Sequence, residues 1–177
     1  FRGYCGRIEG GIFKVGDKIK LLPSGFSSTI TKINIGKKEI KQAFSPMSVS
    51  LCIEGDFDLS RGDMIVKSNN LPFISQELDL LIIWLVEKPL ICPKKLIIKH
   101  STNESNAIVE KILYKIDINT LHKEQNITEL NLNSVGRVKL RTASQLFTDS
   151  YTKNRQTGSI ILIDPNSNLT VGAGLIK

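Results

Sequence analysis

The sequence predicts an all-β protein made of two consecutive antiparallel β-barrels. Short apolar segments alternate with polar residues at a period of two, as in half-buried strands. Clusters of Gly, Pro, Asp and Ser separate these segments at short intervals. The chain is 41% hydrophobic but only 6% aromatic, and its many Leu, Ile and Val residues favour strands. We expect a first barrel over residues 1–70, a linker over 71–76 and a second barrel over 77–177.

Three segments define the strands of the first barrel. In 18–22 and 48–53, aliphatic residues alternate with Lys, Ser or Cys, so one face is buried and the other is polar. Residues 64–67, Met-Ile-Val-Lys, form a further short strand. The preceding Arg-Gly-Asp, residues 61–63, spells an adhesion tripeptide, but Gly62 is suited to the tight turn that enters this strand. We therefore interpret these residues as a turn.

The second barrel is predicted from apolar segments that resume after the polar, Pro-containing stretch 69–77. These segments are "LDLLIIWLV", "KKLIIKH", "GRVKLRT", "GSIILID" and "TVGAGLIK". Residues 107–118 are ambiguous, because their apolar positions fit one face of a helix and also one face of a strand. Frequent β-branched residues favour the strand.

Charge and cysteine usage restrict the class of protein. There are 24 Lys and Arg against 17 Asp and Glu, a net charge of +7 that is spread over both halves of the chain. Such a surface permits an acidic partner, but the dispersed charge and the scarcity of aromatic residues argue against nucleic acid as a ligand. Cys5, Cys52 and Cys92 are odd in number and far apart, which fits a reducing cytoplasm better than a disulfide framework. The longest apolar run, 80–86, is too short to cross a membrane.

No group of residues assembles the chemistry of an active site. The segment 36–38, Gly-Lys-Lys, lacks the upstream Gly and the Ser or Thr of a phosphate-binding loop. Gly-Ala-Gly at 172–174 has no following helix to hold a pyrophosphate and is expected to be a strand bend. His100, placed at a strand end, and His122 are the only two histidines, too few for a multi-histidine metal site. We expect no catalytic, cofactor-binding or metal-binding residue in this chain.

Several segments together resemble a known family. "FRGYCGRIEGGIFKVGDKIKLLPSG" and "AFSPMSVSLCIEGDFDLSRGDMIV" resemble the second domain of translation-factor-type GTPases. "LNSVGRVKLRTASQLFTDSYTKNRQTGSIILIDPNSNLTVGAGLI" is similar to the end of the large, GTP-binding subunit of sulfate adenylyltransferases, and the resemblance covers essentially the whole chain. The barrels of a tRNA-binding elongation factor are the alternative, followed by a freestanding barrel pair that serves as an interaction module.

The resemblance implies a longer, cytoplasmic parent protein. A GTPase domain that binds GTP and Mg²⁺ is expected before Phe1, since the chain opens without Met on a strand-like segment. A small catalytic subunit that binds ATP and adenylates sulfate is the expected partner, together with the parent's own GTPase domain. The barrels are expected to couple GTP hydrolysis to that reaction without chemistry of their own.

Six basic residues are predicted to make interdomain or partner contacts. Arg2, Arg7 and Arg61 lie in the motifs that carry the resemblance. Arg137, Lys139 and Arg141 share one face of a strand whose other face holds Val138 and Leu140. These cations are either a solvated face or an interface to an acidic partner; in a tRNA-binding factor they would be a phosphate track.

Overall fold

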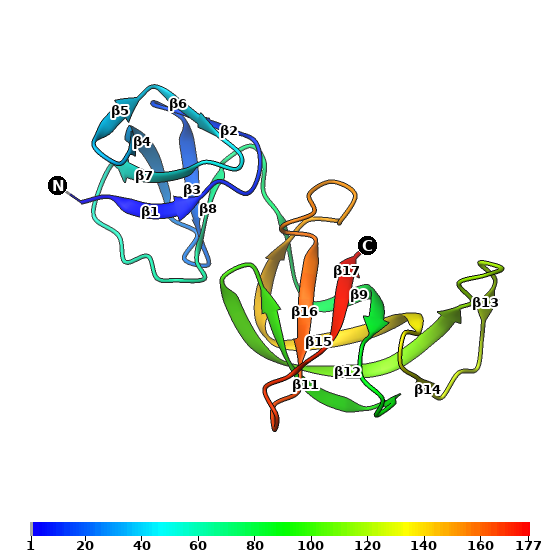
Figure 1. Ribbon diagram of the computed structural model, residues 1–177. Coiled ribbons are helices and arrows are strands. Elements are labelled where there is room, and N and C mark those ends of the chain that lie inside the picture. Colours follow the sequence, from blue (N-terminus) through cyan, green and yellow to red (C-terminus); the bar gives the residue numbers. More distant parts are fainter. Residues whose placement is uncertain (1) are drawn as a thin grey trace. The chain divides into compact units, whose positions relative to one another are not determined.

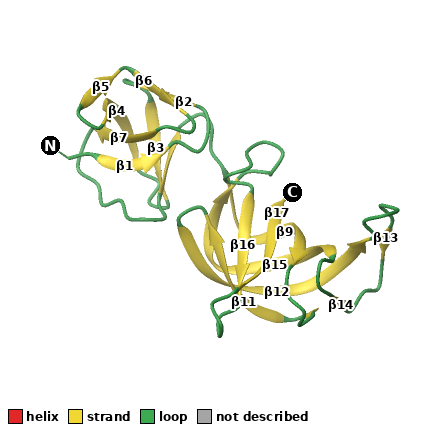
Figure 2. Cartoon of the chain, in the orientation of Figure 1, coloured by secondary structure: helices red, strands yellow, loops and turns green. Residues whose placement is uncertain are grey.

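The structure, a computed structural model, describes residues 2–177 as two compact units, one ending at Pro72 and one beginning at Phe73 (Figure 1). Every strand pairing is antiparallel, and the described residues contain strands and loops but no helix (Figure 2). The predicted all-β class is therefore confirmed. Among residues 2–177, no helix is long and apolar enough to cross a membrane.

The first unit contains eight strands among its described residues. They are β1 (Tyr4–Arg7), β2 (Ile12–Lys14), β3 (Lys18–Leu22), β4 (Ser27–Ile35), β5 (Lys38–Ile40), β6 (Gln42–Phe44), β7 (Ser48–Ile53) and β8 (Met64–Lys67). The main sheet has the order β1-β7-β4-β3-β8, with β5 paired to β4, while β2 and β6 form a separate pair.

The core of the first unit follows the predicted alternation. Ile19 and Leu21 of β3 are fully buried, and Val49, Leu51 and Ile53 of β7 lie beside them in the same apolar cluster. Before β8 the chain turns tightly, with Gly62 at a φ of 104° that favours glycine. The Arg-Gly-Asp tripeptide therefore lies in a turn, as the sequence predicted.

The second unit contains nine strands among its described residues. They are β9 (Phe73–Trp84), β10 (Leu90–Ile91), β11 (Lys94–His100), β12 (Asn103–Ile116), β13 (Lys123–Glu124), β14 (Glu129–Leu130), β15 (Val135–Thr148), β16 (Ser159–Ile163) and β17 (Thr170–Ile176). Six of them form a closed ring in the order β11-β16-β17-β9-β15-β12, because β12 pairs back to β11. This ring is a barrel without free edges.

Inward-facing residues of the ring form a second, separate core. Leu80, Ile82 and Trp84 of β9 are buried in it, and the Trp84 indole Nε1 donates a hydrogen bond to the Lys88 carbonyl at 2.8 Å. Gly172 of β17 comes so close to β9 that a Cβ there would lie 2.9 Å from the backbone oxygen of Ile83. The Gly-Ala-Gly segment is thus part of a strand that needs glycine for close packing.

Two stretches differ in detail from the sequence expectations. Phe73, Ile74 and Ser75, assigned to the linker over 71–76, already pair with β15, so the linker is shorter than expected. The ambiguous stretch 107–118 is strand as far as Ile116, but register shifts after Val109 and Ile112 change which side chains face inward. The predicted strand is therefore present as far as Ile116, although its pairing with β15 is irregular.

Candidate functional site

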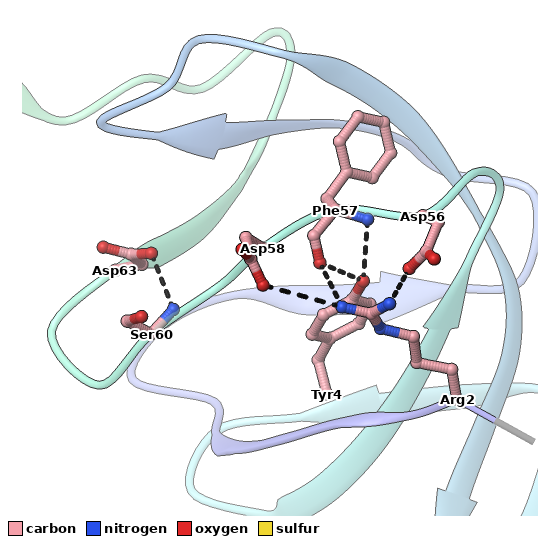
Figure 3. A network of polar contacts seen from close by, with 7 residues as sticks. All are labelled: Arg2, Tyr4, Asp56, Phe57, Asp58, Ser60 and Asp63. Atoms are coloured by element: carbon pink, nitrogen blue, oxygen red, sulfur yellow. Dashed lines mark hydrogen bonds and ion pairs between the residues drawn. The ribbon is translucent and has the colours of Figure 1, made fainter.

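A polar network of the first unit ties the loop between β7 and β8 to β1 and to Arg2, which precedes it (Figure 3). The Tyr4 hydroxyl donates a hydrogen bond to the Phe57 carbonyl at 2.7 Å and accepts one from the Phe57 N–H at 3.2 Å. Arg2 donates to the same carbonyl from Nη2 at 3.0 Å and forms an ion pair with Asp56. The Phe57 side chain packs against the barrel core, so the loop is held from both sides.

Solvent exposure determines how much each contact of this network contributes to stability. The Arg2 side chain is 53% exposed, and its second carboxylate neighbour, Asp58, lies 3.8 Å away and is fully exposed. Ion pairs in this setting contribute about 0–1 kcal/mol each, because water screens them. The hydrogen bonds of Tyr4 are part-buried and therefore dominate. The network fixes the shape of a surface loop and does not resemble a catalytic acid–base pair.

The turn that follows is fixed by its own hydrogen bonds. The Ser60 N–H donates to the Asp63 carboxylate at 2.8 Å, and the Asp63 N–H donates to the Ser60 carbonyl at 3.0 Å. Arg61, between them, is exposed and makes no hydrogen bond or ion pair with residues 2–177. Arg7 lies 4.0 Å from Glu9 and is also largely exposed. Of the first three predicted contact residues, Arg2 is thus engaged within the first unit, while Arg61 remains accessible.

On the second barrel, Arg137 is held by a carboxylate. Its Nε and Nη2 atoms donate to the two oxygens of Asp79, at 2.6 and 2.5 Å, in a bidentate arrangement. The guanidinium also lies 5.8 Å from the centre of the Tyr114 ring. The hydrogen bonds from Arg137 lower the pKa of Asp79, and the same contact raises the pKa of Arg137. Arg137 is therefore a structural partner of Asp79.

Lys139 and Arg141 remain exposed on the same strand, as predicted, while Val138 and Leu140 are buried on its other face. Lys139 pairs in register with Asp79 of β9 on one side and with Lys111 of β12 on the other. The expected row of three free cations is thus interrupted, because Asp79 neutralises the first of them. A continuous phosphate track is not formed here.

A buried network in the second unit was not predicted from the sequence. His100, at the end of β11 as expected, is 3% exposed, and its Nε2 lies 2.8 Å from the Thr157 carbonyl. A carbonyl only accepts hydrogen bonds, so Nε2 carries the proton. Thr157 Oγ1 donates to Asp149, which also pairs with Lys153. Burial lowers the pKa of His100, against smaller opposing effects of Thr157 and Asp149.

One depression of the second unit is small. A shallow depression of about 140 Å³ lies beside Lys99, Ser101 and Gln156, below the several hundred Å³ of a typical ligand pocket. Residues 2–177 also contain no group of three or more His, Cys, Asp or Glu side chains placed to hold a metal ion.

Sequence reasoning could not find Tyr4, Phe57, Asp79 and Thr157, the residues that organise these networks. Each contact joins positions 53 to 58 residues apart, so no local pattern reveals it. The one available signal was the density of Asn, Thr, Lys and Gln in 151–158, which is typical of a hydrogen-bonded loop.

The tandem antiparallel barrels, the second closed into a six-stranded ring, define a barrel pair of the type found in translation-factor GTPases. The structure of Sup35 complexed with GDP superposes with a TM-score of 0.86 at 19% identity, covering 99% of this chain and 45% of that one. This likeness shows the fold. The family model described as GTP-eEF1A C-terminal domain-like matches residues 77–177, and the chain belongs to this family.

Curated relatives match both barrels. The chain is 43% identical over 178 residues to sulfate adenylyltransferase subunit 1 of Aliarcobacter butzleri, covering 100% of this chain and 38% of that protein. Identity is 41% to the same subunit of Bacteroides fragilis and to the bifunctional enzyme CysN/CysC of Mycobacterium tuberculosis H37Rv. Both matches cover 99% of this chain, with 37% and 29% of the relatives. The chain thus spans about a third of the length of these relatives.

Proposed function

We propose that this chain is the two-barrel part of the GTPase subunit of a cytoplasmic sulfate adenylyltransferase. In that reaction a sulfate oxygen bonds to the α-phosphorus of ATP and diphosphate leaves, giving adenosine 5'-phosphosulfate. The observation that carries the proposal is the 41–43% identity to sulfate adenylyltransferase subunits over 99–100% of the chain. The contrast with the 19% identity to Sup35 supports this function over that of a translation factor.

In this proposal the two barrels transmit motion and carry no chemistry. GTP and Mg²⁺ belong to a GTPase domain that precedes the barrels, and ATP and sulfate belong to a second, small subunit. A GTPase switches by ordering loops around the γ-phosphate, and stiff appended domains convert that ordering into a larger displacement. A barrel closed into a ring is suited to this role, because it has no edge strand that can slip or re-pair.

The experiment is a coupled assay on the full-length gene product. The full-length protein and the purified small subunit are mixed with ATP and sulfate, and adenosine 5'-phosphosulfate is measured with GTP, with a non-hydrolysable GTP analogue and without nucleotide. The proposal predicts product formation that GTP stimulates and the analogue does not sustain. A preparation that binds GTP but shows no stimulation would refute it, and binding of charged tRNA would then be the function to test.

A further inference from the structure

The outer surface of the second barrel carries a partly exposed aliphatic region. In β9, Leu80 and Ile82 are fully buried, so their neighbours Leu81 and Ile83 point outward. Ile83 is 41% exposed, although β9 is paired on both sides, with β17 and with β15. Strands with one wet face normally alternate apolar and polar residues, whereas β9 is aliphatic on both faces here. Such a strand is typical of a sheet that is covered on both sides.

The strand register extends this region across five neighbouring strands. Ile83 pairs with Ala173 of β17 and with Val135 of β15, and these pair onward with Ile161 of β16 and Ile116 of β12. Side chains of register partners stand on the same face about 5 Å apart, so these five residues form one continuous row.

The neighbouring row adds Leu81 and its partner Leu175, and on the β15 side it ends at Arg137, the other partner of Leu81. We call these seven residues the aliphatic face. Ile161, at one side of the face, is 42% exposed, like Ile83. The other five residues are half-buried, so the face is a contiguous and partly exposed aliphatic region. Such a region marks an interaction surface, whereas isolated exposed side chains do not.

A basic edge runs along one side of the aliphatic face. Lys139 lies opposite Lys111, and like charges placed directly opposite each other destabilise a sheet. Lys177 adds a third cation, since its N–H donates to the Asp79 carbonyl. The one carboxylate in this row, Asp79, is already bound by Arg137. The edge therefore keeps an excess of positive charge that a surface of Asp and Glu residues would complement.

We propose that the aliphatic face and its basic edge bind the small subunit of the sulfate adenylyltransferase, through an aliphatic patch bordered by Asp and Glu on that subunit. This inference rests on the proposed function. Protein interfaces commonly combine an apolar centre with a polar rim, and the centre supplies most of the affinity. Lys139 lies on the rim, so it is expected to affect the association rate of the partners and the dependence of that rate on salt.

The test measures the Kd of the full-length protein for the purified small subunit. Ile83→Asp places a charge in the centre of the face and is expected to raise Kd about 10- to 100-fold. The matched control is Ile108→Asp, because Ile108 is also an outward strand isoleucine, 40% exposed, but lies between Arg141 and Lys95 outside the face. Lys139→Glu is expected to weaken binding about tenfold and to reduce its dependence on salt.

Each other outcome overturns the proposal in a distinguishable way. Equal Kd values for Ile83→Asp and Ile108→Asp, with wild-type activity intact, exclude this face and leave the proposed function standing. A lower Tm for Ile83→Asp with unchanged Kd assigns the face to the protein's own domains. A dimer of the protein alone that Ile83→Asp abolishes assigns it to a second copy. A wild-type protein that neither binds the subunit nor supports product formation refutes both proposals.

Discussion

Tyr4→Phe tests which contact holds the β7–β8 loop, because it removes one hydroxyl and leaves the ring in place. The hydroxyl makes two hydrogen bonds, to the Phe57 carbonyl and from the Phe57 N–H. The carbonyl keeps the bond from Arg2, whereas the N–H loses its partner. An unsatisfied buried donor costs about 1–3 kcal/mol, and partial access of water here reduces the expected cost to about 1–2 kcal/mol.

Arg2→Ala provides the comparison. It removes an exposed ion pair and one of the two bonds to the Phe57 carbonyl, so we expect a loss of less than about 1 kcal/mol. The assay is native-state hydrogen exchange of the Phe57 amide. Tyr4→Phe is expected to speed this exchange about 5- to 30-fold, while amides of the second barrel stay unchanged. If Arg2→Ala speeds the exchange more than Tyr4→Phe, the ion pairs hold the loop and our reasoning is wrong.

Three further predictions concern the second barrel. Gly158→Ala is expected to destabilise the barrel by more than about 3 kcal/mol, measured by denaturant unfolding, because the new Cβ would lie 2.5 Å or less from backbone atoms of Tyr151. Burial lowers the pKa of His100 below its ordinary 6.5. The unfolded state therefore binds the extra proton, and stability should fall as pH drops below that value, measured as the Tm from about pH 7.5 to about pH 5.5. Asp79→Asn should cost about 1 kcal/mol, measured by the same unfolding, since it leaves Arg137 without its carboxylate.

Each of these predictions has a control and a contradicting outcome. For Gly158 the control is Gly6→Ala, because a Cβ at Gly6 would meet no atom within 4 Å. If both variants lose a similar free energy of unfolding, the steric clash at Gly158 is not the cause of the loss. For His100, the His100→Gln variant should make Tm depend less on pH. If Tm of this variant depends on pH as in the wild type, other titratable groups cause the dependence. For Asp79, the control is the double variant Asp79→Asn with Arg137→Met, which should lose less stability than the sum of the losses of the two single variants. A loss equal to that sum would show that the two residues do not stabilise each other.

The sequence was sufficient where one strand carries its own pattern. The alternation at Ile19 and Leu21 predicted the buried face of β3, and Gly62 predicted the turn before β8, because both signals are local. Phe73–Ser75 could not be recognised as strand, since their partners in β15 lie more than 70 residues away. A separation of 58 residues likewise hid the pairing of Arg137 with Asp79.

The aliphatic face shows a different limit of sequence reasoning. The run "LDLLIIWLV" is apolar at nearly every position, so it predicts a strand but not which side is buried. Only the register identifies the outward residues and shows that their neighbours on four other strands are also aliphatic. A surface defined by five strands has no counterpart in any single segment of the chain.

Trp84 makes the two barrels spectroscopically unequal. It is the only tryptophan of the chain, it is 2% exposed, and it lies in the core of the second barrel. Its emission therefore reports exposure of that core to water and is silent about the first barrel, whose single tyrosine is Tyr4. A fluorescence melt would follow one half of the molecule, and a circular dichroism melt of the same sample would follow both. A difference between the two curves would measure how independently the barrels unfold.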